Sequence, residues 1–176
     1  MKKPPPLPEE QLLRLLRVAR FNGLSFVIIG GLSLLISVGD WFGMAVCAAV
    51  VGAGWLELSG RTRLLAGDAT GVRRMVKAEL LVLAAIEIYC LTRLSQGIGP
   101  ELREAIAGLD MPELEPAFRS AFSATYIAVG MVTIVYQGGM ARYYGRKAGV
   151  VRAALEARAR PAIRVAGQGA PEDEVT

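Results

Sequence analysis

The chain has 176 residues, of which 53% are hydrophobic and 20% are charged, with a formal net charge of +4, two cysteines and no histidine. The lack of histidine removes the usual general base near neutral pH and the commonest metal ligand. The apolar residues are concentrated in four stretches of membrane-spanning length with most charges between them, a distribution that no single soluble core requires. The sequence therefore predicts an all-α, integral membrane four-helix bundle.

A proline-rich and amphipathic segment, residues 1–21, precedes the first apolar stretch. Within it, residues 9–20 (EEQLLRLLRVAR) set leucines among arginines. Two interpretations are open for this run. It could be a short helix in the membrane interface, with arginines among anionic headgroups and leucines in the acyl boundary. It could equally be a simple cytoplasmic extension of the first span.

The first two apolar stretches, residues 22–39 and 41–58, are separated by Asp40 alone. At 1.5 Å per residue, each covers most of a hydrocarbon core of about 30 Å. Because the connection is so short, we expect an antiparallel helical hairpin. A cleaved signal peptide is the alternative interpretation of the first stretch, but its apolar run exceeds the usual length of about 7 to 15 residues.

The third and fourth apolar stretches are residues 78–95 and 120–141. Between them, residues 101–109 have the apolar spacing of one short amphipathic helix. After the fourth stretch, the C-terminal segment 142–176 begins as a basic, alanine-rich helix that we expect to end at Pro161. Its last residues have the composition of a disordered acidic tail.

The basic residues predict how the bundle, residues 22–141, is oriented. Of the 20 lysines and arginines, 17 lie in residues 1–20, in the connection between the second and third stretches, and after the fourth. Basic residues near span ends stay in the cytoplasm, so we expect both termini there and the acidic connection outside, in the inner membrane of a bacterium. The expected partners are the bilayer and its anionic headgroups, and not nucleic acid, because the cations follow the membrane topology.

Glu87 lies near the middle of the third stretch, where a charged group costs about 2.5 to 3.5 kcal/mol on insertion scales. It must therefore face the bundle, water or another subunit. Two hypotheses remain open: an ion, proton or substrate path, or a structural hydrogen bond between helices. The polar residues at similar depth that could share such a path are Thr133, Gln137 and Tyr126 of the fourth stretch and Ser33 of the first.

Two further glutamates, Glu57 and Glu79, lie near the cytoplasmic boundary of the second and third stretches. Arg61 follows Glu57 by four residues on the same helix face, so we predict a local ion pair at the interface. At the outer end of the third stretch, Arg93 is expected to reach the headgroups or to meet Asp40 across the bundle.

The sequence contains no pairing of nucleophile and base, no metal-ligand spacing and no phosphate-binding glycine loop, so we expect no catalytic residues, no metal and no cofactor, and not an enzyme. Two classes of function remain. The first is a structural or accessory membrane subunit, and the second is a homo-oligomeric ion or proton channel or small transporter that uses Glu87. We favour the first because one acidic residue is a weak basis for transport. Assembly into a homo-oligomer or a larger membrane complex is compatible with both classes.

Overall fold

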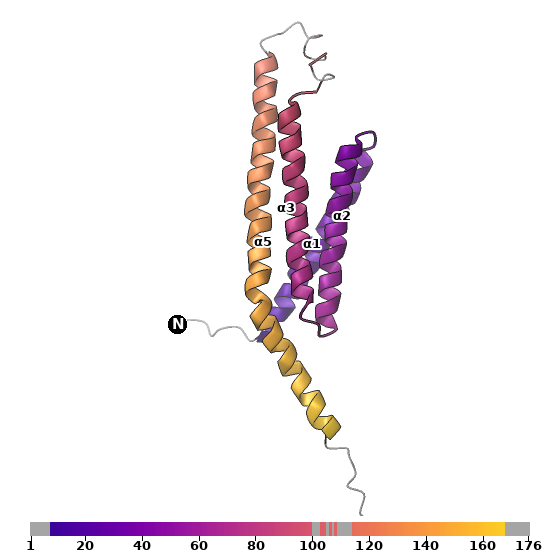
Figure 1. The fold of residues 1–176 in the computed structure, drawn as a ribbon, viewed down its shortest axis with the longest axis vertical. Helices are drawn as coiled ribbons and strands as arrows, with labels where there is room; N and C mark the ends of the chain where they lie inside the picture. The colour runs from indigo at the N-terminus through magenta and orange to yellow at the C-terminus, as the bar shows by residue number, and fades with distance from the viewer. Residues whose placement is uncertain (1–7, 100–102, 105, 107, 109–113, 168–176) are drawn as a thin grey trace, which may run out of the picture.

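The computed structural model describes residues 8–99, 103, 104, 106, 108 and 114–167, with side chains as far as Arg158. Its long helices are α1 (Pro8–Ile36), α2 (Trp41–Leu65), α3 (Gly71–Gln96) and α5 (Leu114–Gly167). They run up and down beside one another, so the start of α1 and the end of α5 lie toward the same end of the molecule (Figure 1). Helix α3 packs on both α2 and α5, and α1 contacts α2 and α5. The predicted all-α four-helix bundle is thus present.

Two tight turns join the first three helices. Asp40 caps the start of α2, where its side chain accepts a hydrogen bond of 3.1 Å from the backbone N–H of Gly43. Just before it, Gly39 has a φ of +100°, and in the next turn Gly67 has a φ of +86°, a conformation that glycine adopts without a steric cost. The predicted antiparallel hairpin of the first two apolar stretches is confirmed.

Helix α1 runs without a break from Pro8 through the predicted boundary at residue 21. The side chains of Leu12, Leu15 and Leu16 are buried, at most 5% exposed, in a cluster with Tyr144 of α5. Because these leucines pack on protein, the run is an extension of the first apolar stretch. The alternative of a separate interfacial helix with its leucines in lipid is wrong.

The C-terminal half of the chain differs from expectation in one boundary. Helix α5 continues past Pro161 to Gly167 and bends in its lower part (Figure 1). A proline's fixed φ is compatible with a helix, although its ring removes one backbone hydrogen bond. The short helix predicted at residues 101–109 lies largely outside the described residues, although residues 103, 104, 106 and 108 are helical. The predicted disordered tail lies outside them from residue 168 onward.

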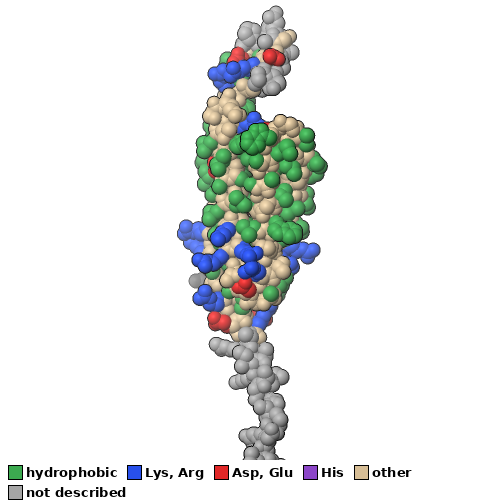
Figure 2. Space-filling model, turned by 45° about the vertical axis from the view of Figure 1, so that its right-hand side comes forward, with side chains coloured by type: hydrophobic (Ala, Val, Ile, Leu, Met, Phe, Trp, Pro, Cys, Tyr) green, Lys and Arg blue, Asp and Glu red, His purple; other side chains and the backbone are tan. Residues whose placement is uncertain are grey.

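The outward faces of the helices are apolar. Figure 2 shows hydrophobic side chains over the upper body of the molecule, with lysines and arginines gathered below them. Among the residues that the structure describes, three helical segments are long and apolar enough to cross a membrane: Glu9–Ile36, Trp41–Leu65 and Leu114–Arg158. Soluble monomers rarely expose such a large contiguous apolar surface. Length, hydropathy and surface thus agree with a helical protein that crosses a membrane more than once.

Helix α3, which contains the predicted third span at residues 78–95, is not among these three segments. The span carries Glu79, Glu87 and Arg93, and these charges reduce its hydropathy. Hydropathy therefore supports three membrane crossings. A fourth crossing, by α3, depends on whether its charged side chains face the other helices.

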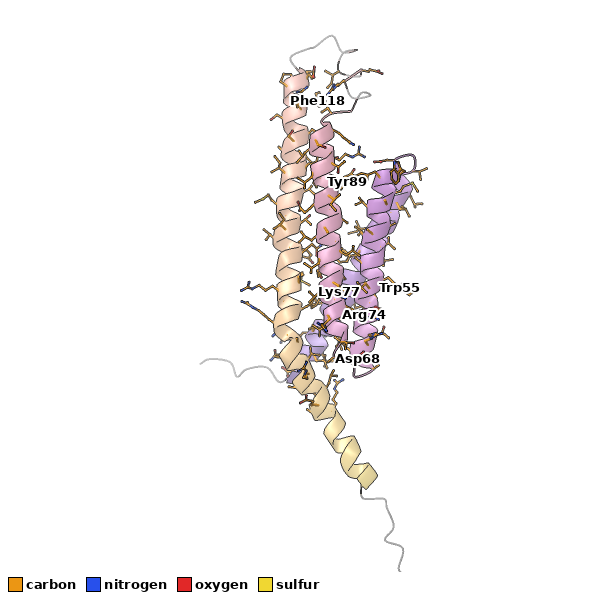
Figure 3. All side chains as sticks on the ribbon, viewed as in Figure 1. Trp55, Asp68, Arg74, Lys77, Tyr89 and Phe118 are labelled. Carbon is orange, nitrogen blue, oxygen red and sulfur yellow. The ribbon has the colours of Figure 1, made fainter. Side chains whose placement is uncertain are left out.

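Two exposed tryptophans lie on α2, one at its start and one just past its middle. Trp41 is 80% exposed at its first residue and Trp55 is 73% exposed further along. Figure 3 shows Trp55 at about the height of Lys77 on α3. Tryptophan rings favour the headgroup level, and a lysine there keeps its charge in water. Tyr144 of α5, by contrast, is completely buried within the protein.

Glycines allow the helices to approach one another closely. A Cβ added to Gly54 of α2 would lie 2.7 Å from the carbonyl oxygen of Gly23 on α1. A Cβ added to Gly71 of α3 would lie 2.3 Å from the carbonyl oxygen of Gly60 on α2. Such contacts between backbones are the main means of helix association where lipid competes for apolar side chains.

Candidate functional site

A buried polar cluster joins three helices at one point. Asn22 of α1 directs its amide Nδ2 at two glutamates, with 3.0 Å to Glu57 Oε2 on α2 and 2.7 Å to Glu79 Oε1 on α3. Asn22 is 4% exposed, and both glutamates are fully buried. The amide group supplies two N–H donors, so it can serve both carboxyl groups at once.

Helix α5 completes the cluster with two tyrosines. Tyr144 donates a hydrogen bond of 2.5 Å to Glu57 Oε1, and Tyr136 donates one of 3.3 Å to the amide oxygen of Asn22. Each of the four long helices therefore contributes at least one polar side chain. One carboxyl oxygen, Oε2 of Glu79, is buried without a hydrogen-bond partner.

The cluster fixes the relative positions of all four helices. Hydrogen bonds to buried charged groups are stronger than those between neutral groups, and removal of one partner exposes the other to a desolvation cost. A sliding or rotation of any one helix would break at least one bond to Asn22 or Glu57. The cluster therefore holds the helices together through hydrogen bonds between buried polar side chains, with Oε2 of Glu79 left without a partner among the described residues.

The predicted ion pair between Glu57 and Arg61 is not formed. Glu57 is turned toward Asn22 and Tyr144, and Arg61 makes no ion pair within the described part of the chain. The Nε atom of Arg61 is buried without a hydrogen-bond partner. The i,i+4 spacing placed the two residues on one helix face, but Glu57 finds hydrogen-bond donors on neighbouring helices instead.

Glu87 lies against α5, the helix that carries Thr133, Gln137 and Tyr126. A Cβ on Gly130 would stand 3.2 Å from Glu87 Oε2, so the missing side chain of this glycine makes room for the carboxyl group. Thr133 and Gln137 are 8% and 5% exposed on the same helix. Glu87 nevertheless makes no hydrogen bond among the described residues, and its Oε1 is buried without a partner.

The other two residues of the predicted path lie elsewhere. Tyr126 packs with Tyr89 and Phe122, with ring centroids 6.1 and 4.7 Å away. Ser33 lines a separate cavity of about 320 Å³ beside Ser37 and Cys47. The structure therefore brings Glu87 to α5 but does not join it to Ser33. A path through Glu87, Thr133, Gln137, Tyr126 and Ser33 stays a prediction.

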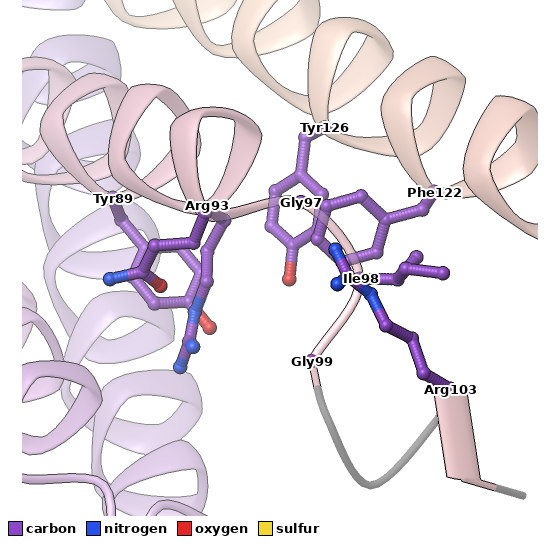
Figure 4. Close-up of a pocket in the computed structure, with 9 residues that line it drawn as sticks. Tyr89, Arg93, Gly97, Ile98, Gly99, Arg103, Phe122 and Tyr126 are labelled. Atoms are coloured by element: carbon purple, nitrogen blue, oxygen red, sulfur yellow. The ribbon is translucent and has the colours of Figure 1, made fainter.

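The predicted contact between Arg93 and Asp40 lies at the end of the bundle where α2 begins and α3 ends. The two side chains form an ion pair that links α3 to the start of α2, and the Arg93 guanidinium lies 5.2 Å from the centre of the Tyr89 ring. Beside them is a cavity of about 610 Å³ between the end of α3 and α5, into which Phe122 and Tyr126 project (Figure 4). The predicted meeting of Arg93 and Asp40 is confirmed.

Sequence reasoning missed three members of the polar cluster: Asn22, Tyr136 and Tyr144. Asn22 stands at the first position of the first apolar stretch, and Tyr144 follows the end of the fourth. The available signal was the placement of two glutamates, Glu57 and Glu79, at the same predicted depth on adjacent helices. Two carboxyl groups at that depth require donors, and an asparagine at the same level on the preceding helix could supply them.

Among the described residues, no group of three or more histidine, cysteine, aspartate or glutamate side chains is arranged to hold a metal ion. Comparisons with protein-family models, with curated proteins and with solved structures found no match to this chain. The function must therefore be inferred from the arrangement of the residues themselves.

Proposed function

We propose that the chain is a four-span membrane protein of a bacterial inner membrane, with both termini in the cytoplasm, and that it serves as a structural or accessory membrane subunit and not as an enzyme. The apolar outer surface and the hydrogen bonds by which the polar cluster joins all four helices support this proposal. So does the gathering of basic side chains below the apolar surface, which is typical of a cytoplasmic boundary.

The surroundings of α3 carry the proposal of a fourth crossing. Its three charges between residues 78 and 95 all face partner helices: Glu79 meets Asn22, Glu87 meets Gly130, and Arg93 meets Asp40. Its outward side chains are apolar and 40–64% exposed, namely Leu80, Leu81, Ile88 and Leu91. A helix in lipid must keep its charged groups on the protein side, and α3 does so.

Cysteine accessibility tests the topology. In a background with Cys47→Ala and Cys90→Ala, single cysteines would replace Asp68 in the turn before α3, Gln96 at the end of α3, or Glu156 on α5. With four crossings, a membrane-impermeant maleimide should label the cysteine at 96 in intact cells, and those at 68 and 156 only after permeabilisation. If α3 did not cross, the cysteine at 96 would be protected and that at 156 labelled.

Purified protein in lipid vesicles tests the structural role. A structural subunit should show no cation or proton flux above that of protein-free vesicles at any pH from 5 to 8. Detergent-solubilised protein should run as one species of defined mass. Flux that depends on the protein would exclude a purely structural role.

A channel or small transporter is the second candidate, and it rests on Glu87. The buried, unpartnered oxygen of this residue beside Gly130 is what an ion or proton site between α3 and α5 would need. If vesicles show flux, Glu87→Gln should abolish it, while Glu115→Gln on the exposed start of α5 should leave it unchanged. Flux that survives Glu87→Gln would exclude this candidate.

A further inference from the structure

One face of α5 carries a basic groove below the apolar surface of the bundle. A cavity of about 490 Å³ runs along it, lined by Gly139, Arg142, Tyr143, Arg146, Lys147 and Val150. Steps of three and four residues place these side chains on one side of the helix. Three of the six are cationic and none is acidic, so the groove is a concentrated positive site.

Within the described ranges, no acidic side chain forms an ion pair with these cations. Arg142 and Arg146 are exposed and form no ion pair within the described part of the chain. Lys147 donates a hydrogen bond of 2.7 Å to the amide oxygen of Gln11 on α1. Glutamine is neutral, so it holds the ammonium group in place without cancelling its charge. The nearby Glu9 is paired with Arg158.

An apolar track continues from the groove along the same helix. Met131, Val132 and Val135, two to three turns before Arg142, are 60–72% exposed. Between the track and the arginines, Gly138 and Gly139 have no neighbouring atom within 4 Å of where a Cβ would stand. The surface thus offers first apolar contact, then open space beside the backbone, and then positive charge.

We propose that this groove binds the headgroup of an anionic phospholipid. The phosphate lies among Arg142, Arg146 and Lys147, and the acyl chains follow Val132 and Val135 toward the outer end of the bundle. The guanidinium group of an arginine can donate two parallel hydrogen bonds to the oxygens of one phosphate. The cytoplasmic leaflet of the membrane contains anionic lipids. The inference rests on the proposed membrane location, since only a bilayer presents headgroup and chains in this order.

Lipid titration of the purified protein in detergent tests the proposal without reference to topology, so its failure is separate from a failure of the span assignment. Native mass spectrometry would count bound phosphatidylglycerol and phosphatidylcholine of identical chains, with inorganic phosphate as competitor. The test variant combines Arg142→Gln and Arg146→Gln. The control combines Arg17→Gln and Arg152→Gln, which removes the same charge from exposed positions outside the groove.

We expect phosphatidylglycerol to bind in preference to phosphatidylcholine, and the groove variant to weaken it about 25-fold, or about fivefold for each cation. The control should stay within about twofold. Gly139→Leu, which fills the open space without a change of charge, should also weaken binding, and thermal unfolding checks that each variant is folded. Equal loss in the groove and control variants, lack of lipid preference, or displacement by millimolar phosphate would overturn the proposal.

Discussion

The amide nitrogen of Asn22 donates a hydrogen bond of 2.7 Å to Glu79, and so joins the first helix to the third inside the protein. The same nitrogen lies 3.0 Å from the carboxylate of Glu57 on the second helix. One neutral side chain therefore donates hydrogen bonds to two buried glutamates, and both glutamates lose this donor when Asn22 is replaced.

Asn22→Leu should destabilise the bundle by about 3 kcal/mol, because two buried carboxyl groups lose a donor that water cannot replace. Reversible unfolding in mixed micelles of dodecyl maltoside and dodecyl sulfate would measure the change. Ser25→Ala, one turn along on an exposed face where the hydroxyl only bonds the carbonyl of Phe21, should change stability by less than about 0.5 kcal/mol. Equal effects of the two substitutions would contradict the role of Asn22.

Tyr144→Phe should cost about 1 to 2 kcal/mol, because the ring stays packed while Glu57 loses the hydroxyl that donates to it. The neighbouring Tyr143 is the matched control, since its hydroxyl has no hydrogen-bond partner among the described residues. Tyr143→Phe should leave the midpoint of thermal unfolding within about 2 °C of the parent. A larger effect at Tyr143 than at Tyr144 would show that ring packing, and not the hydrogen bond to Glu57, dominates the stability of this part of the bundle.

Gly71→Ala should destabilise the contact of α2 with α3 by about 2 kcal/mol, because the new methyl group would lie 2.3 Å from the carbonyl oxygen of Gly60. Gly52→Ala on α2 meets no atom within 4 Å and should leave stability unchanged or raise it by up to about 1 kcal/mol. The unfolding midpoints of both variants, compared with that of the parent protein, would measure these changes in stability. Tolerance of alanine at residue 71 would mean that the two helices are farther apart than described.

Asp68 should make the turn between α2 and α3 sensitive to acid. Hydrogen bonds from the hydroxyl and the backbone N–H of Thr70 hold the pKa of Asp68 below its ordinary value of 3.8. Because folding lowers this pKa, the stabilisation is present above pH 3.8 and is lost as the pH falls through the lower, folded-state value. Thermal unfolding of Asp68→Asn should therefore begin at lower temperature than that of the parent at pH 7, with a difference that shrinks below about pH 3.

The main features of the fold could be predicted from local sequence properties. The last three apolar stretches each lie within one long helix, and the first lies in α1 except for residues 37–39, which form the turn before Asp40. The short connection at Asp40 forced a hairpin. The pairing of Arg93 with Asp40 could be anticipated because both residues lie at the same end of the predicted bundle, where few other charges compete. These results depend on length, hydropathy and the order of charges along the chain, which a sequence displays directly.

The polar cluster could not be predicted in this way, because it depends on how helices are rotated about their axes. Residues 57 and 61 lie on one face of α2, yet Glu57 turns to Asn22 while Arg61 pairs with neither glutamate. Likewise, the leucines of residues 12–16 have the spacing of an interfacial helix, and only the proximity of α5 shows that protein covers them. Contacts between segments that are far apart in the sequence cannot be predicted from the hydrophobic periodicity of either segment.

The burial of Leu12, Leu15 and Leu16 against Tyr144, Val151 and Ala154 also orders the events of synthesis. The same cluster contains Leu64 of α2 and Val72 and Met75 of α3, which follow Leu16 within about 60 positions, whereas its α5 members follow more than 120 positions later. During synthesis, the side of α1 that meets α5 therefore stays open to chaperones or to lipid until α5 has been made. Truncation within α5 would thus expose leucines of α1, where a protease could reach them.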